Sequence, residues 1–183
     1  MGVPSLKPND TALLVVDMQE KLVPAMREPE TLTRQVTRLI DGVQILGIPA
    51  LVTEQYPKGL GQTVDPLASR LETAYCRAEK TCFTACIESI KDALDALNVH
   101  CVVVAGIEAH VCVMQTCLDL VNRGYVVGAA LDAVSARHPH DQDLAERRLQ
   151  QAGVLPLSVE SALMELIGDA SDSRFKQIRE LIK

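Results

Sequence analysis

Three residues of this sequence have side chains that can act together in nucleophilic catalysis. Asp17 comes directly after the apolar run 12–16, and Cys112 follows the run 101–105 where a predicted helix begins. Lys80 ends a less regular stretch. A thiolate is a strong nucleophile, a carboxylate can carry a proton, and an ammonium or a helix N-terminus stabilises negative charge. These three side chains are therefore candidates for nucleophilic catalysis.

The elements that must position these residues alternate between strands and helices. Short apolar runs predict buried strands at residues 12–16, 48–53, 101–105, 125–131 and 154–157. Apolar residues at helical spacing predict helices at residues 31–46, 87–97, 111–121, 141–151 and 175–182. For residues 56–80 the sequence predicts mainly loop, with a short helix and room for one strand. We therefore expect an α/β fold with three layers and a mostly parallel, roughly six-stranded sheet.

Such a sheet also predicts where a ligand binds, because open parallel sheets take their ligands beyond the carboxyl ends of the strands. The chemically capable residues that follow strands are Asp17, Glu54, Asp132 and the segment 108–112. Glycines that suit the left-handed position at a helix end precede three of the predicted strands, at Gly47, Gly124 and Gly153.

Three short motifs carry a resemblance to a known family. They are VDMQ at residues 16–19, EK at 79–80 and GIEAHVCV at 106–113. In this order they resemble the isochorismatase-like cysteine hydrolase family. The strings TEQYPKGLG at 53–61 and KTCF at 80–83 are similar to the branch of the isochorismatase-domain-containing proteins. The resemblance covers nearly the whole chain and implies the isochorismatase-like hydrolase fold, as one domain over residues 1–183.

The resemblance implies a catalytic triad. Cys112 is then the nucleophile, Asp17 carries the proton, and Lys80 holds the thiolate and orients Asp17. The backbone N–H groups of Glu108 and Cys112 form the oxyanion hole, and a cis peptide bond joins Ile107 to Glu108. The position of Cys112 at a helix start beside Lys80 would lower the pKa of the thiol.

Four further residues are candidates for substrate binding: Tyr56, Phe83, Gln19 and Glu54. Only 3% of the residues are aromatic, so Tyr56 and Phe83 are noticeable, with core packing as an equal alternative for both. Glu108 stands where many hydrolytic relatives carry a small residue. It either narrows the pocket, contacts a neighbouring subunit or repels anionic substrates, and the sequence leaves these three alternatives open.

The sequence predicts no metal or other cofactor. Nicotinamidases of this fold bind a divalent metal through an Asp and paired histidines after the second strand, whereas no histidine lies between Asp17 and His100 here. His138 and His140 lack a placed third ligand, so we interpret them as loop residues. Cys82 and Cys86 share one helix face and are interpreted as core residues, with oxidation sensing as the alternative.

Composition and charge indicate which classes of partner the protein binds and where it is located. The formal net charge is −6 and the isoelectric point is near 5.2, which argues against a duplex nucleic-acid binder. No apolar run approaches the ~18 residues of a membrane-spanning helix, and residues 1–8 lack a secretory pattern. We expect a cytoplasmic protein that takes a small-molecule substrate and binds neither nucleic acid nor membrane. The resemblance implies a homo-oligomer.

The predicted function is metal-independent hydrolysis of a small amide or related C–N bond through a thioester on Cys112. True isochorismatases cleave a vinyl ether and lack the cysteine, so vinyl-ether hydrolysis is the less favoured enzymatic alternative. A protein of this fold that binds a small molecule without turnover, or that responds to oxidation at Cys112, is the non-enzymatic alternative. The apolar stripe of Phe175, Ile178 and Ile182 either forms a subunit interface or folds back onto the chain.

Overall fold

The computed structural model describes residues 4–183, and within them six strands form one parallel sheet. The order across the sheet is β3-β2-β1-β4-β5-β6. The strands are β1 (Thr11–Val16), β2 (Ala50–Gln55), β3 (Cys76–Lys80), β4 (Cys101–Ile107), β5 (Val126–Ser135) and β6 (Leu155–Leu157). This confirms the α/β class and the parallel sheet that the alternation of apolar runs predicts.

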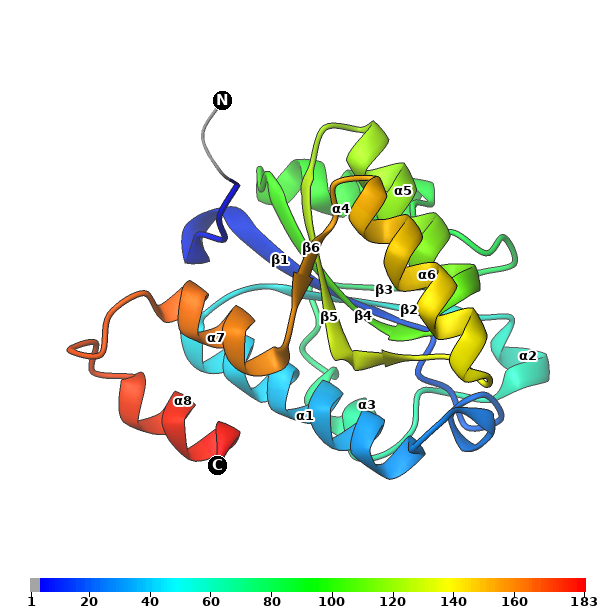
Figure 1. Ribbon diagram of the computed structural model, residues 1–183, viewed down its shortest axis with the longest axis horizontal. Coiled ribbons are helices and arrows are strands. Elements are labelled where there is room, and N and C mark those ends of the chain that lie inside the picture. The colour runs from blue at the N-terminus through cyan, green and yellow to red at the C-terminus, as the bar shows by residue number, and fades with distance from the viewer. Residues whose placement is uncertain (1–3) are drawn as a thin grey trace.

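Helices cover both faces of the sheet (Figure 1). On one face lie α1 (Pro29–Leu46), α3 (Leu67–Arg70), α7 (Val159–Ile167) and α8 (Phe175–Ile182). On the other lie α4 (Glu88–Leu97), α5 (Met114–Asn122) and α6 (Pro139–Gln151). The short α2 (Pro57–Leu60) follows β2, beyond the carboxyl edge of the sheet.

Each face of the sheet has its own hydrophobic core, because successive side chains of a strand point to opposite faces. In β1, Leu13 and Val15 pack under α1 and α7, whereas Leu14 and Val16 pack under α4 and α5. The strand is therefore apolar throughout and buried on both sides, as is typical of the centre of a parallel sheet.

Strand β3 lies in the stretch that the sequence predicts to be mainly loop. It is an edge strand in which Ala78 and Lys80 are buried while Arg77 and Glu79 are exposed. Its polar alternation hides it from a search for apolar runs. Strand β2 also extends to Gln55, two residues beyond the prediction.

Two glycines fix how chain segments meet. Gly47 ends α1 in the left-handed region, with φ of 73°, and lets the chain turn into β2. Gly106 in β4 has φ of 120°, and a Cβ atom there would lie 2.1 Å from the carbonyl oxygen of Val16. Glycine at this position therefore permits the close approach of β4 to the end of β1.

The C-terminal helix α8 folds back onto the chain. Its Ile178 is fully buried, and Phe175 and Ile182 pack against the core beneath α1. This finding selects the second of the two alternatives that the apolar stripe left open. None of the helices within residues 4–183 combines the length and the apolar character that crossing a bilayer demands.

Candidate active site

The candidate catalytic residues come from the carboxyl edge of the sheet, around its topological switch point. From β1 the chain adds β2 and β3 on one side, whereas β4, β5 and β6 extend the sheet on the other. Asp17 follows β1, Lys80 is the last residue of β3, and Cys112 lies just after β4. Open α/β sheets form their ligand-binding crevice at such a point.

Asp17 and Lys80 form an ion pair closed off from solvent. Lys80 Nζ lies 2.6 Å from Asp17 Oδ2, and neither side chain is exposed. Thr53 Oγ1 donates a hydrogen bond to Asp17 Oδ1 at 2.8 Å. An unpaired charge in such a place would be strongly destabilising, so each member of the pair depends on the other. Asp17 itself has a left-handed backbone, with φ of 53°, which points its carboxylate inward from the end of β1.

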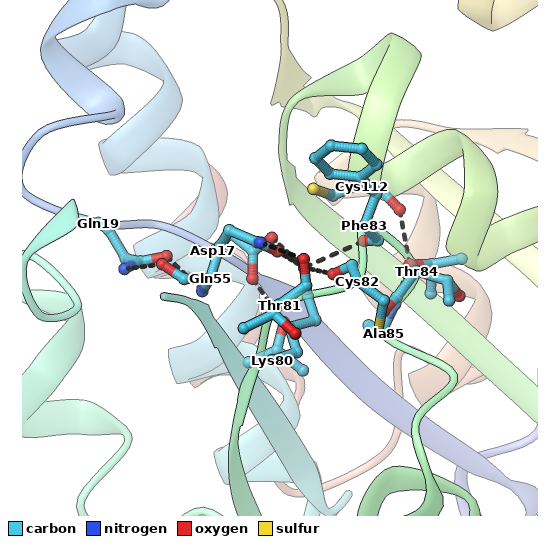
Figure 2. A network of polar contacts seen from close by, with 12 residues as sticks. Asp17, Gln19, Gln55, Lys80, Thr81, Cys82, Phe83, Thr84, Ala85 and Cys112 are labelled. Carbon is cyan, nitrogen blue, oxygen red and sulfur yellow. Dashed lines mark hydrogen bonds and ion pairs between the residues drawn. The ribbon is translucent and has the colours of Figure 1, made fainter. Parts of the chain in front are cut away.

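The ammonium group of Lys80 has no hydrogen left to donate. It contacts Asp17 Oδ2 at 2.6 Å, Gln55 Oε1 at 2.7 Å and the carbonyl oxygen of Phe83 at 3.0 Å (Figure 2). The carbonyl oxygen of Cys82 lies at 3.4 Å. Because an ammonium carries three N–H donors, these acceptors use all of them. Lys80 can therefore hold and orient its neighbours but is not placed to protonate a ligand.

Cys112 lies beside this pair, and its side chain is largely buried. Burial raises the pKa of Cys112 to about 12; the negative charge of Asp17 adds to the rise, and Lys80 offsets part of it. Burial and Asp17 thus outweigh the lowering expected from the lysine and the helix start. The resting side chain is a neutral thiol, so a nucleophilic role needs a base that takes its proton during attack.

A π-helical turn, Ala109–Val113, carries Cys112 from β4 into α5. The N–H of Val113 donates to the carbonyl oxygen of Glu108, five residues earlier, at 3.2 Å. The peptide bond between Ile107 and Glu108, just before this turn, is cis, at the position that the family resemblance implied. Turns of the π type are frequent at functional sites.

The segment 81–86, between β3 and α4, is tied down at both ends. Lys80 binds its first residues through their carbonyl oxygens. At the other end, Thr116 Oγ1 accepts a hydrogen bond from the N–H of Ala85 at 2.8 Å and donates to the carbonyl oxygen of Cys112 at 2.6 Å. Asp17, Lys80 and the backbone of Cys112 are thus linked through the segment 81–86 (Figure 2).

Gln19 lies in this network but not where a ligand could reach it. Its Nε2 donates to the carbonyl oxygens of Gln55 and Gly61, at 2.9 and 2.7 Å, and its Oε1 accepts from the N–H of Gln55 at 2.7 Å. The side chain is fully buried. It fastens the end of β2 to the loop after α2, so the structure gives it a role in positioning rather than in substrate contact.

Glu54 points away from the other candidate residues. It lies on the opposite face of β2 from Thr53, where its Oε1 accepts from the N–H of Thr63 at 2.8 Å and pairs with Arg77 at 2.9 Å. The structure therefore does not bring Glu54 to the site. The physical reason is the two-residue period of a strand, which turns Thr53 and Gln55 toward the Cys112 face and Glu54 toward the other.

The two aromatic candidates are both exposed. Tyr56 and Phe83 each leave more than half of their surface to solvent, which excludes core packing for either. Phe83 belongs to the segment that Lys80 binds, so its ring is carried close to the catalytic candidates. Tyr56 lines a cavity of about 700 Å³ that also borders Lys80, Cys82 and Ile87.

Glu108 forms an ion pair rather than projecting freely. Arg137 Nε donates to Glu108 Oε2 at 2.9 Å, from the segment that leads into α6. Two residues further on, His110 Nε2 lies 3.9 Å from Asp141 Oδ2, while His110 Nδ1 has no partner among residues 4–183. The side chains of Glu108 and His110 thus both face the start of α6.

Nothing within residues 4–183 groups three or more metal-ligating side chains. His138 and His140 are exposed. All six cysteines are free; Cys82 is exposed, whereas burial raises the pKa of Cys86 to about 11.

Three residues of the network were missed from the sequence: Thr53, Gln55 and Thr116. Gln55 was hidden because the predicted strand ended at Thr53, and Thr53 itself was predicted only as the last residue of that strand. With β2 extended to Gln55, the period of two places both on the face of Leu51, which packs in the core beneath Cys112. Thr116 lies four residues after Cys112, one turn along the helix, and that spacing was the available signal.

Comparisons with known proteins agree with this fold. The family model described as the isochorismatase domain matches residues 11–161. The isochorismatase domain-containing protein 1 of Danio rerio is 39% identical over 180 residues, which are 98% of this chain and 63% of that protein. The chain thus spans less than two thirds of that relative.

Two solved structures are similar along nearly their whole length. The MAR1 ribonuclease of Caenorhabditis elegans is 40% identical, with a TM-score of 0.93 over 98% of this chain and 92% of that one. YcaC from Pseudomonas aeruginosa, solved with hexane-2,5-diol and covalent acrylamide, is 26% identical, with a TM-score of 0.93 over 99% and 93% of the two chains.

Proposed function

Because this chain belongs to the isochorismatase family, we propose that it is a hydrolase that cleaves a small amide or related C–N bond with Cys112 as nucleophile. The observation that carries the proposal is the solvent-free ion pair of Asp17 and Lys80 beside the thiol. A carboxylate, an ammonium and a thiol that adjoin in a buried site are suited to acyl transfer through a thioester. The proposed reaction uses no metal ion, since its base and its nucleophile are both side chains.

In the first step the sulfur of Cys112 attacks the carbonyl carbon while its proton passes to Asp17. The carbonyl electron pair moves onto oxygen, and the backbone N–H groups of Glu108 and Cys112 stabilise the resulting oxyanion. When the oxyanion collapses, the C–N bond breaks and the leaving amine takes the proton from Asp17. A thioester on Cys112 and a free amine result.

In the second step water hydrolyses the thioester. Asp17 takes a proton from the water as its oxygen attacks the acyl carbon. Collapse of this second oxyanion breaks the C–S bond, and the departing sulfur recovers the proton from Asp17. The products are a carboxylic acid and the original thiol, so the site is ready for another turnover.

Lys80 acts in this scheme without exchanging a proton. Its three N–H donors are already used, so it keeps the carboxylate of Asp17 in one place and opposes the negative charge that develops on sulfur.

The similar proteins support a reactive nucleophile on this fold. Acrylamide is an electrophile that thiolates add to, and the neighbour from Pseudomonas aeruginosa holds it covalently. The neighbour from Caenorhabditis elegans is named a ribonuclease. We favour a small neutral amide over RNA for this chain, because nucleic-acid binding rests on Lys and Arg that neutralise phosphates, whereas this chain has a net charge of −6.

The proposal is tested with a panel of small amides and other C–N compounds, assayed for release of ammonia or amine, with a vinyl ether and single-stranded RNA in the same panel. We expect hydrolysis of an amide and an acyl adduct on Cys112 that forms and clears, seen by mass spectrometry. Cys112→Ala should abolish both. The matched control is Cys76→Ala, a free cysteine on the edge strand, which should keep them. Cleavage of RNA or vinyl ether alone, or full activity in Cys112→Ala, would refute the proposal.

We also propose that the chain forms a homo-oligomer. Exposed aromatic side chains support it: Tyr56, Tyr75 and Phe83 each leave about half of their surface to solvent. Light scattering coupled to gel filtration should give a mass that is a multiple of 19.9 kDa. A mass of one chain at all concentrations would contradict this proposal and leave the reaction untouched.

A further inference from the structure

Both the side chain and the backbone of Gln55 form hydrogen bonds with residues around the candidate active site. Its Oε1 accepts from Lys80 Nζ at 2.7 Å, and its Nε2 donates to the carbonyl oxygen of Thr81 at 2.8 Å. Its backbone N–H and carbonyl are both bound by the side chain of Gln19. With the side-chain oxygen and nitrogen both engaged, Gln55 can act on the reaction only through its neighbours.

The contact between Gln55 and Lys80 is important because Gln55 is an uncharged acceptor for a charged ammonium group. The ammonium has three close acceptors, and only one of them, Asp17, is charged. The other two are the amide oxygen of Gln55 and the carbonyl oxygen of Phe83. Both neutral acceptors satisfy N–H donors without drawing the ammonium away from Asp17. A second carboxylate in the place of Gln55 would divide the attraction and leave the buried site with a surplus negative charge.

We propose that Gln55 is a positioning residue, which fixes the ammonium of Lys80 between Asp17 and the segment 81–86 while adding no charge of its own. The positive charge of Lys80 is then undivided when the thiol of Cys112 loses its proton. This role extends the proposed function, and its effect on turnover depends on that function. Its effect on the acidity of Cys112 does not require turnover and can be measured separately.

The groups that set this acidity come from several elements. Asp17 from the end of β1 and Lys80 from β3 act directly on the thiol. His110 lies on the same turn as Cys112, near Asp141 of α6. Glu108 comes just before that turn and is paired with Arg137, which precedes α6.

The first test is the pH dependence of alkylation of Cys112 by iodoacetamide, read by mass spectrometry, in Gln55→Glu. This variant keeps the shape and the acceptor for Lys80, adds a negative charge, and replaces the donor to the carbonyl oxygen of Thr81 by a carboxylate oxygen. Below the pKa the rate follows the thiolate fraction, so an upward shift of one unit slows alkylation about tenfold at each pH. We expect a loss of about this size at Cys112 and none at Cys76, the free cysteine at the other end of β3.

The same variant is assayed for amide hydrolysis, where we expect kcat to fall about tenfold and KM to change by less than about twofold. Gln55→Leu, which removes the acceptor without adding charge, should lower kcat as well while leaving the pH dependence of alkylation closer to that of the wild type. Gln44→Leu is the matched control. Its Nε2 also donates to a backbone carbonyl, that of Arg70, far from the site.

Alkylation and kcat of Gln55→Glu within about twofold of the wild type would overturn this inference. Equal slowing in Gln44→Leu would also overturn it, because a general loss of stability would then explain the effect. A wild-type protein without amide hydrolysis, in which Gln55→Glu still slows alkylation of Cys112, would refute the proposed function and support the positioning role.

Discussion

Two buried carboxylates near the end of β2 lie on opposite faces of the sheet, and each forms an ion pair with a cation. On one face the carboxylate of Asp17 meets Lys80 at 2.6 Å, and on the other the carboxylate of Glu54 meets Arg77 at 2.9 Å. Both carboxylates are almost completely buried. The cations differ, because the Lys80 side chain has no exposed surface whereas that of Arg77 is 39% exposed.

The difference shows that a buried carboxylate alone does not mark a catalytic site. Glu54 accepts both the N–H and the hydroxyl of Thr63, so it fastens a loop to the sheet, and solvent screens its cation. Asp17 faces a cation sealed from solvent and a thiol whose pKa its charge helps to raise. The burial of the cation and the presence of a nucleophile separate the two pairs.

The largest expected contrast is in catalysis. Asp17→Asn keeps the shape of the side chain but removes the proton acceptor, and we expect kcat to fall on the order of 10²–10⁴-fold. Glu54→Gln is the same change on the other face and should leave kcat within about twofold of the wild type. Steady-state amide hydrolysis measures both. Equal losses of kcat in the two variants would show that the two ion pairs do not differ in their importance for catalysis.

The next contrast is in stability. Lys80→Met leaves the carboxylate of Asp17 buried without its cation, and we expect the free energy of unfolding to fall by about 3–5 kcal/mol. Arg77→Met removes a half-exposed cation and should cost about 1 kcal/mol or less. Urea denaturation followed by circular dichroism gives both values. The double variant Asp17→Leu/Lys80→Met should recover part of the loss, since it leaves no unpaired charge.

The smallest contrast is in alkaline stability, because a thiol adjoins the Asp17 pair. A thiol with a raised pKa holds its proton more tightly in the folded state. Its contribution to stability is complete below the ordinary pKa of 9.0 and is lost as the pH rises toward about 12. Cys112→Ala should therefore lose less stability than the wild type between about pH 9 and 11. Parallel curves for the two proteins would contradict the assigned pKa.

The sheet could be predicted from the sequence because its central strands are apolar on both faces. The runs around Val15 and Val103 are buried completely and give an unambiguous signal. Strand β3 was not identified from the sequence, because its exposed residues, Arg77 and Glu79, are polar and interrupt the apolar pattern. The short strand length predicted for β2 then assigned Glu54 to the site and overlooked Gln55, since an error in the end of a strand changes which face its last residues occupy.

The three catalytic candidates could be named from the order of the motifs, whereas the electrostatics around them could not be predicted in that way. The sequence shows the attractive charge of Lys80 and the helix start, and from these it predicts a lowered pKa for Cys112. Desolvation depends on what packs around the thiol, and here it dominates. The π-helical turn Ala109–Val113 was likewise hidden, since its hydrogen bonds differ from those of an α-helix only in span.

The central place of β1 in the sheet has a consequence for synthesis on the ribosome. Asp17 and Lys80 both emerge within the first 80 residues, but β4, which pairs with β1 along its whole length, comes only at residues 101–107. Until then one edge of β1 and the carboxylate beyond it remain open to water. The nascent chain can therefore join β1 to β2 and β3 early, whereas the sealed charge pair and its thiol neighbour form only after more than half of the polypeptide has been made.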